Sequence, residues 1–399
     1  MRILLLAPHP FVTERGTPIA VAEIARGLAD LNHAVDVVTY HLGTDLQHPG
    51  VTVHRIARPA GIAHVPIGPS WQKAICDIAL YRLAKKLLRN TRYDLIHAVE
   101  EAAFFACRLG RQFDLPYVYD MDSQMSSQIR EKSALLTPAA WVFDRLERRA
   151  IARSAGVLAV CPALLDWAKP LHPHGRVHLL PDMPLGINPN DDDGGALPDA
   201  ITQPGGVKLM YVGNLEHYQG VDLLIEAFTQ AHVADEASLI IVGGDDASIA
   251  AAKSRAAAHQ WERSVHFAGP VPVGRLGRVL QAADVLVSPR LKGQNTPMKI
   301  YSYLQSGRAV LATDLPTHTQ VLDRNVAALA DPTPDALAQA IRSLVCGDSA
   351  QTQRAALGQA GQALIQREYT PARYRERLAT FYTEITADGA TPSAPRETP

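Results

Sequence analysis

The sequence predicts an α/β protein made of two successive domains, each a doubly wound parallel sheet with helices on both faces. Short continuous runs of Val, Ile and Leu alternate with helical patterns, which is typical of parallel strands buried on both sides. The alternation is interrupted once, near residues 188–206, and then starts again. The length of 399 residues also suits two domains better than one.

Each expected strand is a short apolar run, and each expected helix has apolar residues at a period near 3.6. In the first domain the expected strands are 3–7, 34–39, 94–98, 117–119 and 157–160, and the first helix is 18–31. In the second domain the expected strands are 209–213, 238–243, 265–268, 285–288 and 309–312, with helices at 221–231 and 247–259.

These patterns divide the chain into five segments. Residues 1–187 form an N-terminal domain, and residues 188–206, rich in Asp, Gly and Pro, form a linker. Residues 207–370 form a C-terminal domain, and the helical segment 371–386 is expected to pack back on the N-terminal domain. The tail 387–399, rich in Pro, Thr and Ala, is expected to be disordered.

Composition excludes several classes of protein. The net charge of -1 leaves no large basic surface, so nucleic acid is not an expected partner. The four cysteines are widely spaced and form no metal-like pair, which suits reduced thiols in the cytoplasm. The apolar run at the N-terminus ends at Pro8, too early for a signal peptide, so we expect a buried strand there. No apolar segment is long enough to span a membrane.

The stretch 288–304 predicts an anion-binding site. It has the pattern of a strand end, a polar loop and a helix with Pro297 at its first position. The first amides of a helix lack partners within the helix, and they attract phosphate together with the helix dipole. Arg290, Lys292 and Lys299 add positive charge to this region. The alternative is that these three are ordinary solvated charges.

A second candidate loop follows the first strand. Gly16 would let a backbone approach a ligand closely, and Thr17 would serve as the N-cap of the next helix. An ordinary strand-to-helix turn explains both residues equally well. No G-x-G-x-x-G pattern is present, so the sequence gives no support for a dinucleotide-binding dehydrogenase.

Five motifs follow one another along the second domain. They are YVGNLEHYQGVDLLIEAF at 211–228, IVGG at 241–244, VHFAGPV at 265–271, AADVLVSP at 282–289 and SGRAVLAT at 306–313. In this order they resemble the motifs of glycosyltransferase family 4. Weaker matches in the first domain are the opening strand, Gly16 and the segment ERRAIA at 147–152.

The resemblance implies the GT-B fold, in which two Rossmann-like domains face each other across a cleft. It implies transfer of a sugar from a nucleotide diphosphate sugar, such as a UDP- or GDP-sugar, to a hydroxyl group of a glycan, lipid or small molecule. The C-terminal domain would bind the donor, and the N-terminal domain the acceptor. Family members usually retain the anomeric configuration and need no metal ion, so neither a metal nor a further cofactor is expected.

The donor site departs from the family pattern. The family usually has an arginine and a lysine that hold the diphosphate, at the places of Asn214 and Gln219. Its two glutamates, eight residues apart, fall near Gln294 and at Ser302, and the second usually contacts the ribose. We expect nearby cations to replace the missing pair. The expected donor-binding residues are Gly16, Thr17, Asn214, Gln219, Arg290, Lys292, Asn295, Thr296, Pro297, Met298, Lys299 and Ser302.

Acidic residues follow two strands of the first domain. His97, Glu100 and Glu101 accompany the strand 94–98, and a carboxylate there would orient or deprotonate an acceptor hydroxyl. Acids favoured by a helix dipole are an equally good explanation. Asp122 lies close to where the family often has a histidine that contacts the transferred sugar, and capping of the next helix is its alternative role. His97, Glu100 and Asp122 are the catalytic candidates.

The segment 67–89 suggests contact with the inner face of a membrane. Trp71, several leucines and the basic residues near its end would dock on anionic lipid. Packing of apolar positions such as Ile75 and Ile78 on the sheet is the preferred explanation, with shallow membrane contact in addition.

Two other functions fit parts of the pattern. The missing donor-site residues would also suit a non-catalytic protein of this fold that binds a sugar or a partner subunit. Asp120 and Asp122 form an Asp-x-Asp pair, which holds a divalent metal in a different glycosyltransferase fold.

Overall fold

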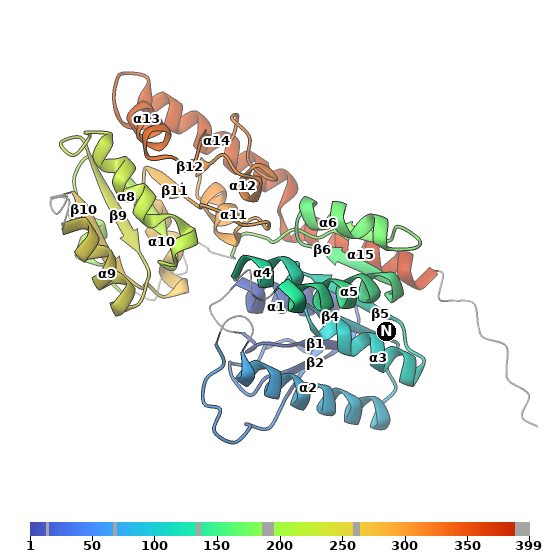
Figure 1. The fold of residues 1–399 in the computed structure, drawn as a ribbon. Coiled ribbons are helices and arrows are strands. Elements are labelled where there is room, and N and C mark those ends of the chain that lie inside the picture. The colour runs from blue at the N-terminus through green and yellow to red at the C-terminus, as the bar shows by residue number, and fades with distance from the viewer. Residues whose placement is uncertain (13–15, 67–69, 133–136, 186–194, 258–263, 388–399) are drawn as a thin grey trace, which may run out of the picture. The chain divides into compact units, whose positions relative to one another are not determined.

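A computed structural model describes residues 1–12, 16–66, 70–132, 137–185, 195–257 and 264–387. The chain divides into two compact units (Figure 1). Unit 1 is Met1–Pro181 with the C-terminal segment from Pro371, and unit 2 is Asp182–Thr370. Each unit contains one parallel sheet among its described residues, which confirms the predicted α/β fold class.

Unit 1 has the strand order β3-β2-β1-β4-β5-β6-β7, with parallel pairing throughout the described strands. Its strands are β1 (Arg2–Ala7), β2 (Ala34–Thr39), β3 (Val51–Arg55), β4 (Leu95–Val99), β5 (Tyr117–Met121), β6 (Gly156–Ala159) and β7 (Val177–Leu179). Its α-helices are α1 (Gly16–Asp30), α2 (Trp71–Asn90), α3 (Ala102–Phe113), α4 (Met125–Lys132), α5 (Thr137–Arg153), α6 (Pro162–Ala168) and α15 (Pro371–Ala387).

The sheet of unit 1 is covered on both faces, which explains its continuous apolar strands. Leu4, Leu6 and Ile96 pack in one buried cluster with the inner sides of α2, α3 and α5. Helices α1 and α15 pack against each other. The last helix therefore belongs to unit 1, although the chain reaches it only after leaving unit 2.

Unit 2 has the strand order β10-β9-β8-β11-β12-β13, again parallel among the described strands. Its strands are β8 (Val207–Val212), β9 (Ala237–Val242), β10 (Val265–Gly269), β11 (Val285–Ser288), β12 (Ala309–Thr313) and β13 (Ala328–Ala330). Its α-helices are α7 (Asp199–Thr202), α8 (Val221–Gln230), α9 (Asp246–Ala257), α10 (Leu276–Gln281), α11 (Met298–Gln305), α12 (Pro316–Thr319), α13 (Pro334–Val345) and α14 (Ala350–Glu368).

Some elements differ from the sequence-based expectation. The edge strands β3, β7 and β13 were not predicted, because their apolar runs are interrupted by polar residues or are only three residues long. Along the chain, unit 1 ends at Pro181 and unit 2 begins at Asp182, whereas the expected N-terminal domain ends at residue 187. Within the expected linker the structure describes 195–206, where α7 buries Ile201 against the sheet of unit 2. The rest of the Asp- and Gly-rich stretch and the tail from residue 388 lie outside the described residues.

Candidate functional site

The two polar loops of unit 2 lie next to each other, because they follow the neighbouring parallel strands β8 and β11. The backbone amide of Leu291 donates to the carbonyl of Tyr218 over 2.9 Å. Gly220 adopts a φ of 74°, and a Cβ there would lie 1.9 Å from the carbonyl oxygen of Pro289. Glycine is therefore required where the loops touch.

Lys299 lies in the first turn of α11 and reaches toward the β8 loop. Its Nζ donates to Oε1 of Gln219 over 3.1 Å and lies 4.1 Å from the centre of the Tyr211 ring. Burial and the positive charge of Arg290 lower the pKa of Lys299 to about 7. This amine occupies the neighbourhood of Gln219, where the family pattern has one of its two cations.

Arg290 holds the β11 loop in place. Its Nη1 donates to the carbonyl of Asn295 over 3.0 Å and to Oγ1 of Thr317 over 2.9 Å. Its guanidinium lies 5.2 Å from the centre of the Tyr218 ring. Among the described atoms, Nε of Arg290 and Oγ1 of Thr296 are buried without a hydrogen-bond partner. Buried donors without a partner are rare in native proteins, so these two indicate that a ligand accepts their hydrogen bonds.

His318 and Thr317 are site residues that the sequence analysis missed. Nε2 of His318 lies 2.9 Å from Oγ of Ser288, and Nδ1 lies 2.8 Å from the carbonyl of Thr313. Burial lowers the pKa of His318 to about 4, so the ring is neutral and adds no charge. The signal that could have found both residues is their position after β12, at the same edge of the sheet.

The other expected donor residues are placed as follows. Asn214 is exposed, and its side chain accepts from the amide of Glu216 over 3.4 Å. Lys292 is also exposed, whereas Met298 in the first turn of α11 is half-buried. Pro297 was expected at the first helical position, which is wrong. Its ψ of 131° is extended, so it is the N-cap residue and α11 begins at Met298.

Ser302 lies deeper than a ribose contact would suggest. Its side chain is buried, and Oγ accepts a hydrogen bond from the amide of Leu185 over 3.2 Å. The serine therefore fixes the segment that enters unit 2. Its expected role in ribose recognition stays a prediction.

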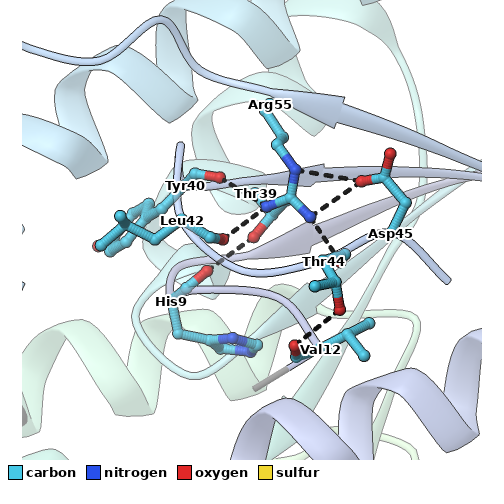
Figure 2. A network of polar contacts seen from close by, with 8 residues as sticks. All are labelled: His9, Val12, Thr39, Tyr40, Leu42, Thr44, Asp45 and Arg55. Atoms are coloured by element: carbon cyan, nitrogen blue, oxygen red, sulfur yellow. Dashed lines mark hydrogen bonds and ion pairs between the residues drawn. The ribbon is translucent and has the colours of Figure 1, made fainter.

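In unit 1, Arg55 at the end of β3 organises the loop after β2 (Figure 2). The guanidinium donates to the carbonyl of Leu42 over 2.5 Å and that of Thr44 over 2.6 Å, and it pairs with Asp45 at 2.9 Å. Oγ1 of Thr44 in turn donates to the carbonyl of Val12 over 3.2 Å. This network holds the chain that leads from β1 toward Gly16.

Gly16 and Thr17 open α1. Thr17 was expected to be the N-cap, which is wrong, because the helix already includes Gly16. A Cβ built on Gly16 would meet no described atom within 4 Å. The protein packing described here does not require glycine, so the expected approach of a ligand stays a prediction. Residues 13–15 of this loop lie outside the described residues.

The carboxyl end of β4 carries a cluster of ionisable side chains. Lys73 at the start of α2 pairs with Glu101, with 2.5 Å between Nζ and Oε1. The hydroxyl of Tyr40 donates to Asp77 one turn further along α2. Burial and the neighbouring charge of Glu101 raise the pKa values of Glu100 and Asp77 to about 7 each.

The backbone at Glu100 is unusual. It adopts a φ of 48°, a left-handed conformation that costs energy in a residue with a Cβ. Its amide donates to the carbonyl of Asp120 over 2.9 Å, and its own carbonyl accepts from Ala103. Glu101, not Glu100, is the N-cap residue of α3, and it makes no side-chain capping bond. The alternative that both glutamates are first-turn acids of a helix is therefore wrong.

His97, a catalytic candidate, is fully buried. Its Nδ1 lies 2.7 Å from the hydroxyl of Tyr382 on α15, and its Nε2 lies 3.4 Å from Oδ2 of Asp120. The ring thus joins α15 to the sheet, which suits a positioning role better than direct contact with a substrate.

Asp122 is half-buried just after β5. The first amides of the next helix, those of Met125 and Ser126, donate to the carboxylate of Glu147 on α5 over 2.6 and 3.3 Å. The carboxylate that caps α4 is thus that of Glu147, so capping is not needed to explain Asp122. Within the described residues, no group of three or more His, Cys, Asp and Glu side chains could hold a metal ion.

Two family models match the chain. Residues 206–346 match "Glycosyl transferases group 1", and residues 15–182 match "Glycosyl transferase 4-like domain". This chain belongs to the family 4-like glycosyltransferases. The glycosyltransferase is similar to the phosphatidyl-myo-inositol mannosyltransferase of Mycobacterium tuberculosis, with 24% identity over 98% of each chain.

Solved structures place the glycosyltransferase in the GT-B fold, as predicted. It is similar to sucrose-phosphate synthase from Thermosynechococcus elongatus, with a TM-score of 0.78 and 18% identity over 97% of this chain and 99% of that one. It is also similar to Anabaena HepE in complex with UDP, with a TM-score of 0.71 and 16% identity over 96% of this chain and 100% of that one. Among its described helices, none combines the length and apolar character needed to cross a bilayer.

Proposed function

We propose that this enzyme transfers a sugar from a UDP- or GDP-sugar to the hydroxyl of an acceptor, with retention and without a metal ion. The observation that carries the donor assignment is the pair Lys299 and Arg290, which lie beside the N-terminus of α11. Neither cation makes an ion pair with a carboxylate of the described residues. The complexes of HepE with UDP and with UDP-glucose support a nucleotide-sugar donor.

The charges of unit 2 suit the departure of a diphosphate. Negative charge grows on the diphosphate as its bond to the sugar breaks, and fixed cations stabilise that transition state more than the ground state. Lys299, Arg290 and the first amides of α11 supply this charge in place of the pair missing at Asn214 and Gln219. Lys292, which is exposed, adds a weaker and more screened contribution.

Unit 1 offers acceptors for hydroxyl groups. Glu100 and Asp122 follow the neighbouring strands β4 and β5, so their backbones meet at one edge of the sheet. Their carboxylates accept hydrogen bonds from the acceptor and from the transferred sugar. His97 acts through Asp120 as a positioning residue.

The outer surface of unit 1 suits the inner face of an anionic membrane. The expectation that Ile75 and Ile78 pack on the sheet is wrong: they are 41% and 52% exposed, and Trp71 is 63% exposed. The buried side of α2 is instead formed by Cys76, Leu80, Ala84 and Leu88. Trp141, Val142 and Leu146 are exposed on α5, which covers the same face of the sheet. Exposed basic residues lie on the same helices, at Arg82, Lys86, Arg89, Arg145, Arg148 and Arg149.

The decisive experiment incubates the purified enzyme with UDP-, GDP- and ADP-sugars, with and without a chelator. We expect slow release of UDP or GDP from one donor in both conditions, and faster release when a hydroxylated acceptor is added. Failure to bind or cleave any donor would contradict the proposal. Activity lost in chelator and restored by a divalent ion would favour the Asp-x-Asp alternative, and the anomeric proton of the product reports retention.

Membrane contact has its own test. Vesicles with anionic lipid should sediment the enzyme, whereas neutral vesicles should not, because the exposed basic residues need negative charge. Replacing Trp71 and Ile78 by serine should reduce sedimentation, and equal sedimentation of this variant would contradict the proposal.

A further inference from the structure

The donor loops of unit 2 enclose a positive charge that the described protein does not balance. Nζ of Lys299 has one hydrogen-bond acceptor among the described atoms, the uncharged Oε1 of Gln219. A Cβ built on Gly213 would lie 3.0 Å from this Nζ, so the backbone after β8 closes over the amine. Lys299 is half-buried, and an ammonium group that is partly shielded from water and has no counter-ion is destabilised.

The groups around Lys299 do not supply the missing negative charge. Tyr211 from β8 offers its ring face, which attracts a cation but carries no net negative charge. Arg290 from the β11 loop repels the ammonium, and burial outweighs every other influence on it. The remaining titratable groups are the neutral His318 of α12 and the phenols of Tyr218 and Tyr303, while Glu216 is exposed and acts on Tyr211.

Unpartnered donors beside the lysine indicate what is missing. Oγ1 of Thr296, two residues before the start of α11, is buried. Nε of Arg290, in the same loop, is also buried. Both lack a partner among the described atoms, and both are donors that an anion would satisfy. A diphosphate would therefore complete the hydrogen bonds of the loop and provide the counter-ion of Lys299.

We propose that at pH 8 Lys299 is largely neutral in the nucleotide-free enzyme and takes up a proton when the donor's diphosphate binds. This inference rests on the proposed function, since it assigns the diphosphate to this site. The buffer supplies the proton, and the ammonium that forms is stabilised by the phosphate oxygens. Donor binding then weakens as the pH rises, because a higher pH opposes protonation.

The lowered pKa of Lys299, about 7, agrees with this geometry. A phosphate group beside the amine would return its pKa toward the ordinary value of about 10.4. At pH 8 the free enzyme would hold little of this proton, whereas the complex would hold nearly all of it. The uptake should therefore be about 0.5–1 proton per bound nucleotide.

Isothermal titration calorimetry of the whole enzyme with UDP and with GDP tests the inference. Titrations at pH 8 in buffers with different ionisation enthalpies give the number of protons taken up. The terminal phosphate of these nucleotides has a pKa near 6, so it contributes little at this pH. We expect uptake with wild type at pH 8. At pH 5.5, where Lys299 is already protonated, we expect no uptake but a net release, because the terminal phosphate loses its own proton beside the cations.

Two variants locate the proton. Lys299→Arg keeps a fixed charge and should bind the nucleotide with almost no uptake, because arginine stays protonated. The matched control Lys253→Arg changes an exposed lysine of unit 2 on α9, outside the donor loops, and should keep the wild-type uptake.

The outcomes are distinguishable. Nucleotide binding without proton uptake overturns this inference and leaves the proposed function intact. Uptake that persists in Lys299→Arg also overturns it, because the proton then goes to another group. Failure of UDP and GDP to bind the wild-type enzyme overturns the inference and the proposed donor together. A fall in uptake confined to the Lys299 variant supports it.

Discussion

The two units have the same kind of parallel sheet but opposite charge at its carboxyl edge. In unit 1, Asp77, Glu100 and Glu101 lie within electrostatic reach of one another and of Lys73, and Asp120 lies within reach of Glu100. In unit 2, Lys299 and Arg290 lie together without an ion-paired carboxylate in the described part of the chain. The fold thus places both groups of loop residues at the carboxyl edge of a sheet, and the identity of those residues decides the charge there.

The same substitution should therefore have different effects in the two units. Lys73→Met leaves the buried carboxylate of Glu101 without its partner, so we expect a loss of about 3 kcal/mol in the free energy of unfolding. Lys299→Met removes a half-buried amine that has no counter-ion, so we expect a change within about 1 kcal/mol, of either sign. Urea unfolding followed by circular dichroism measures both. Equal losses of unfolding free energy in the two variants would contradict the view that Lys73 is ion-paired and Lys299 is not.

For nucleotide affinity we expect the opposite ranking, with a large effect of Lys299→Met and none of Lys73→Met. Lys299→Met should weaken UDP or GDP binding by roughly 10- to 100-fold, because a charge-assisted hydrogen bond is lost. Lys73→Met should leave the affinity of unit 2 for nucleotide unchanged as long as the enzyme is folded. Calorimetry at pH 7 measures this difference. A nucleotide affinity that depends on Lys73 and not on Lys299 would reverse our assignment of the donor.

The two units should also respond to pH with opposite signs. The pKa of Glu100 is raised to about 7, so the folded state holds the proton more tightly than the unfolded state, and stability falls as the pH rises from about 4.5 to 7. The pKa of Lys299 is lowered to about 7, so the unfolded state holds the proton more tightly, and stability rises from about pH 7 to 10.

Single variants separate the effects of Glu100 and Lys299 on the dependence of the free energy of unfolding on pH. Glu100→Gln should reduce the fall below pH 7, to which Asp77 with its pKa of about 7 also contributes, and Lys299→Met should remove the rise above pH 7 that Lys299 causes. Because both groups are only half-buried, each contribution should be about 1 kcal/mol after allowance for solvent screening. Parallel curves of unfolding free energy against pH for wild type and either variant would contradict the assignment for that residue.

The smallest expected effect concerns Ser302. Ser302→Ala loses one neutral hydrogen bond to the amide of Leu185, so the free energy of unfolding should fall by about 1 kcal/mol. If the serine only fixes the chain, the affinities for UDP and GDP should not change. A change in nucleotide preference would instead support the ribose contact that the family resemblance implies.

Much of the fold could be predicted because its determinants are local. The expected strands at 34–39 and 285–288 have the same bounds as β2 and β11, since each is an apolar run that ends at polar residues. The short strands β3, β7 and β13 could not be predicted, because pairing with a neighbouring strand, and not apolar length, makes them strands.

The candidate site was predicted in part. Spacing alone placed Arg290 and Lys299 around the start of α11. It could not show that Lys299 reaches Gln219, eighty positions away in the sequence. It also could not show that Thr317 and His318, on the helix α12 that follows β12, contact Arg290 and Ser288. It also could not show that His97 is buried beside Tyr382 of α15, and the catalytic role of His97 stays a prediction.

By itself, the sequence determined the α/β class, the two domains and the family, because apolar periodicity and collinear motifs are properties of the chain. Only the tertiary structure decided which charges are balanced. Glu101 meets Lys73 across two helices, whereas Lys299 meets an amide and an aromatic ring. The free energy of a charged group depends on the neighbouring groups and on its exposure to water, and the tertiary structure determines both.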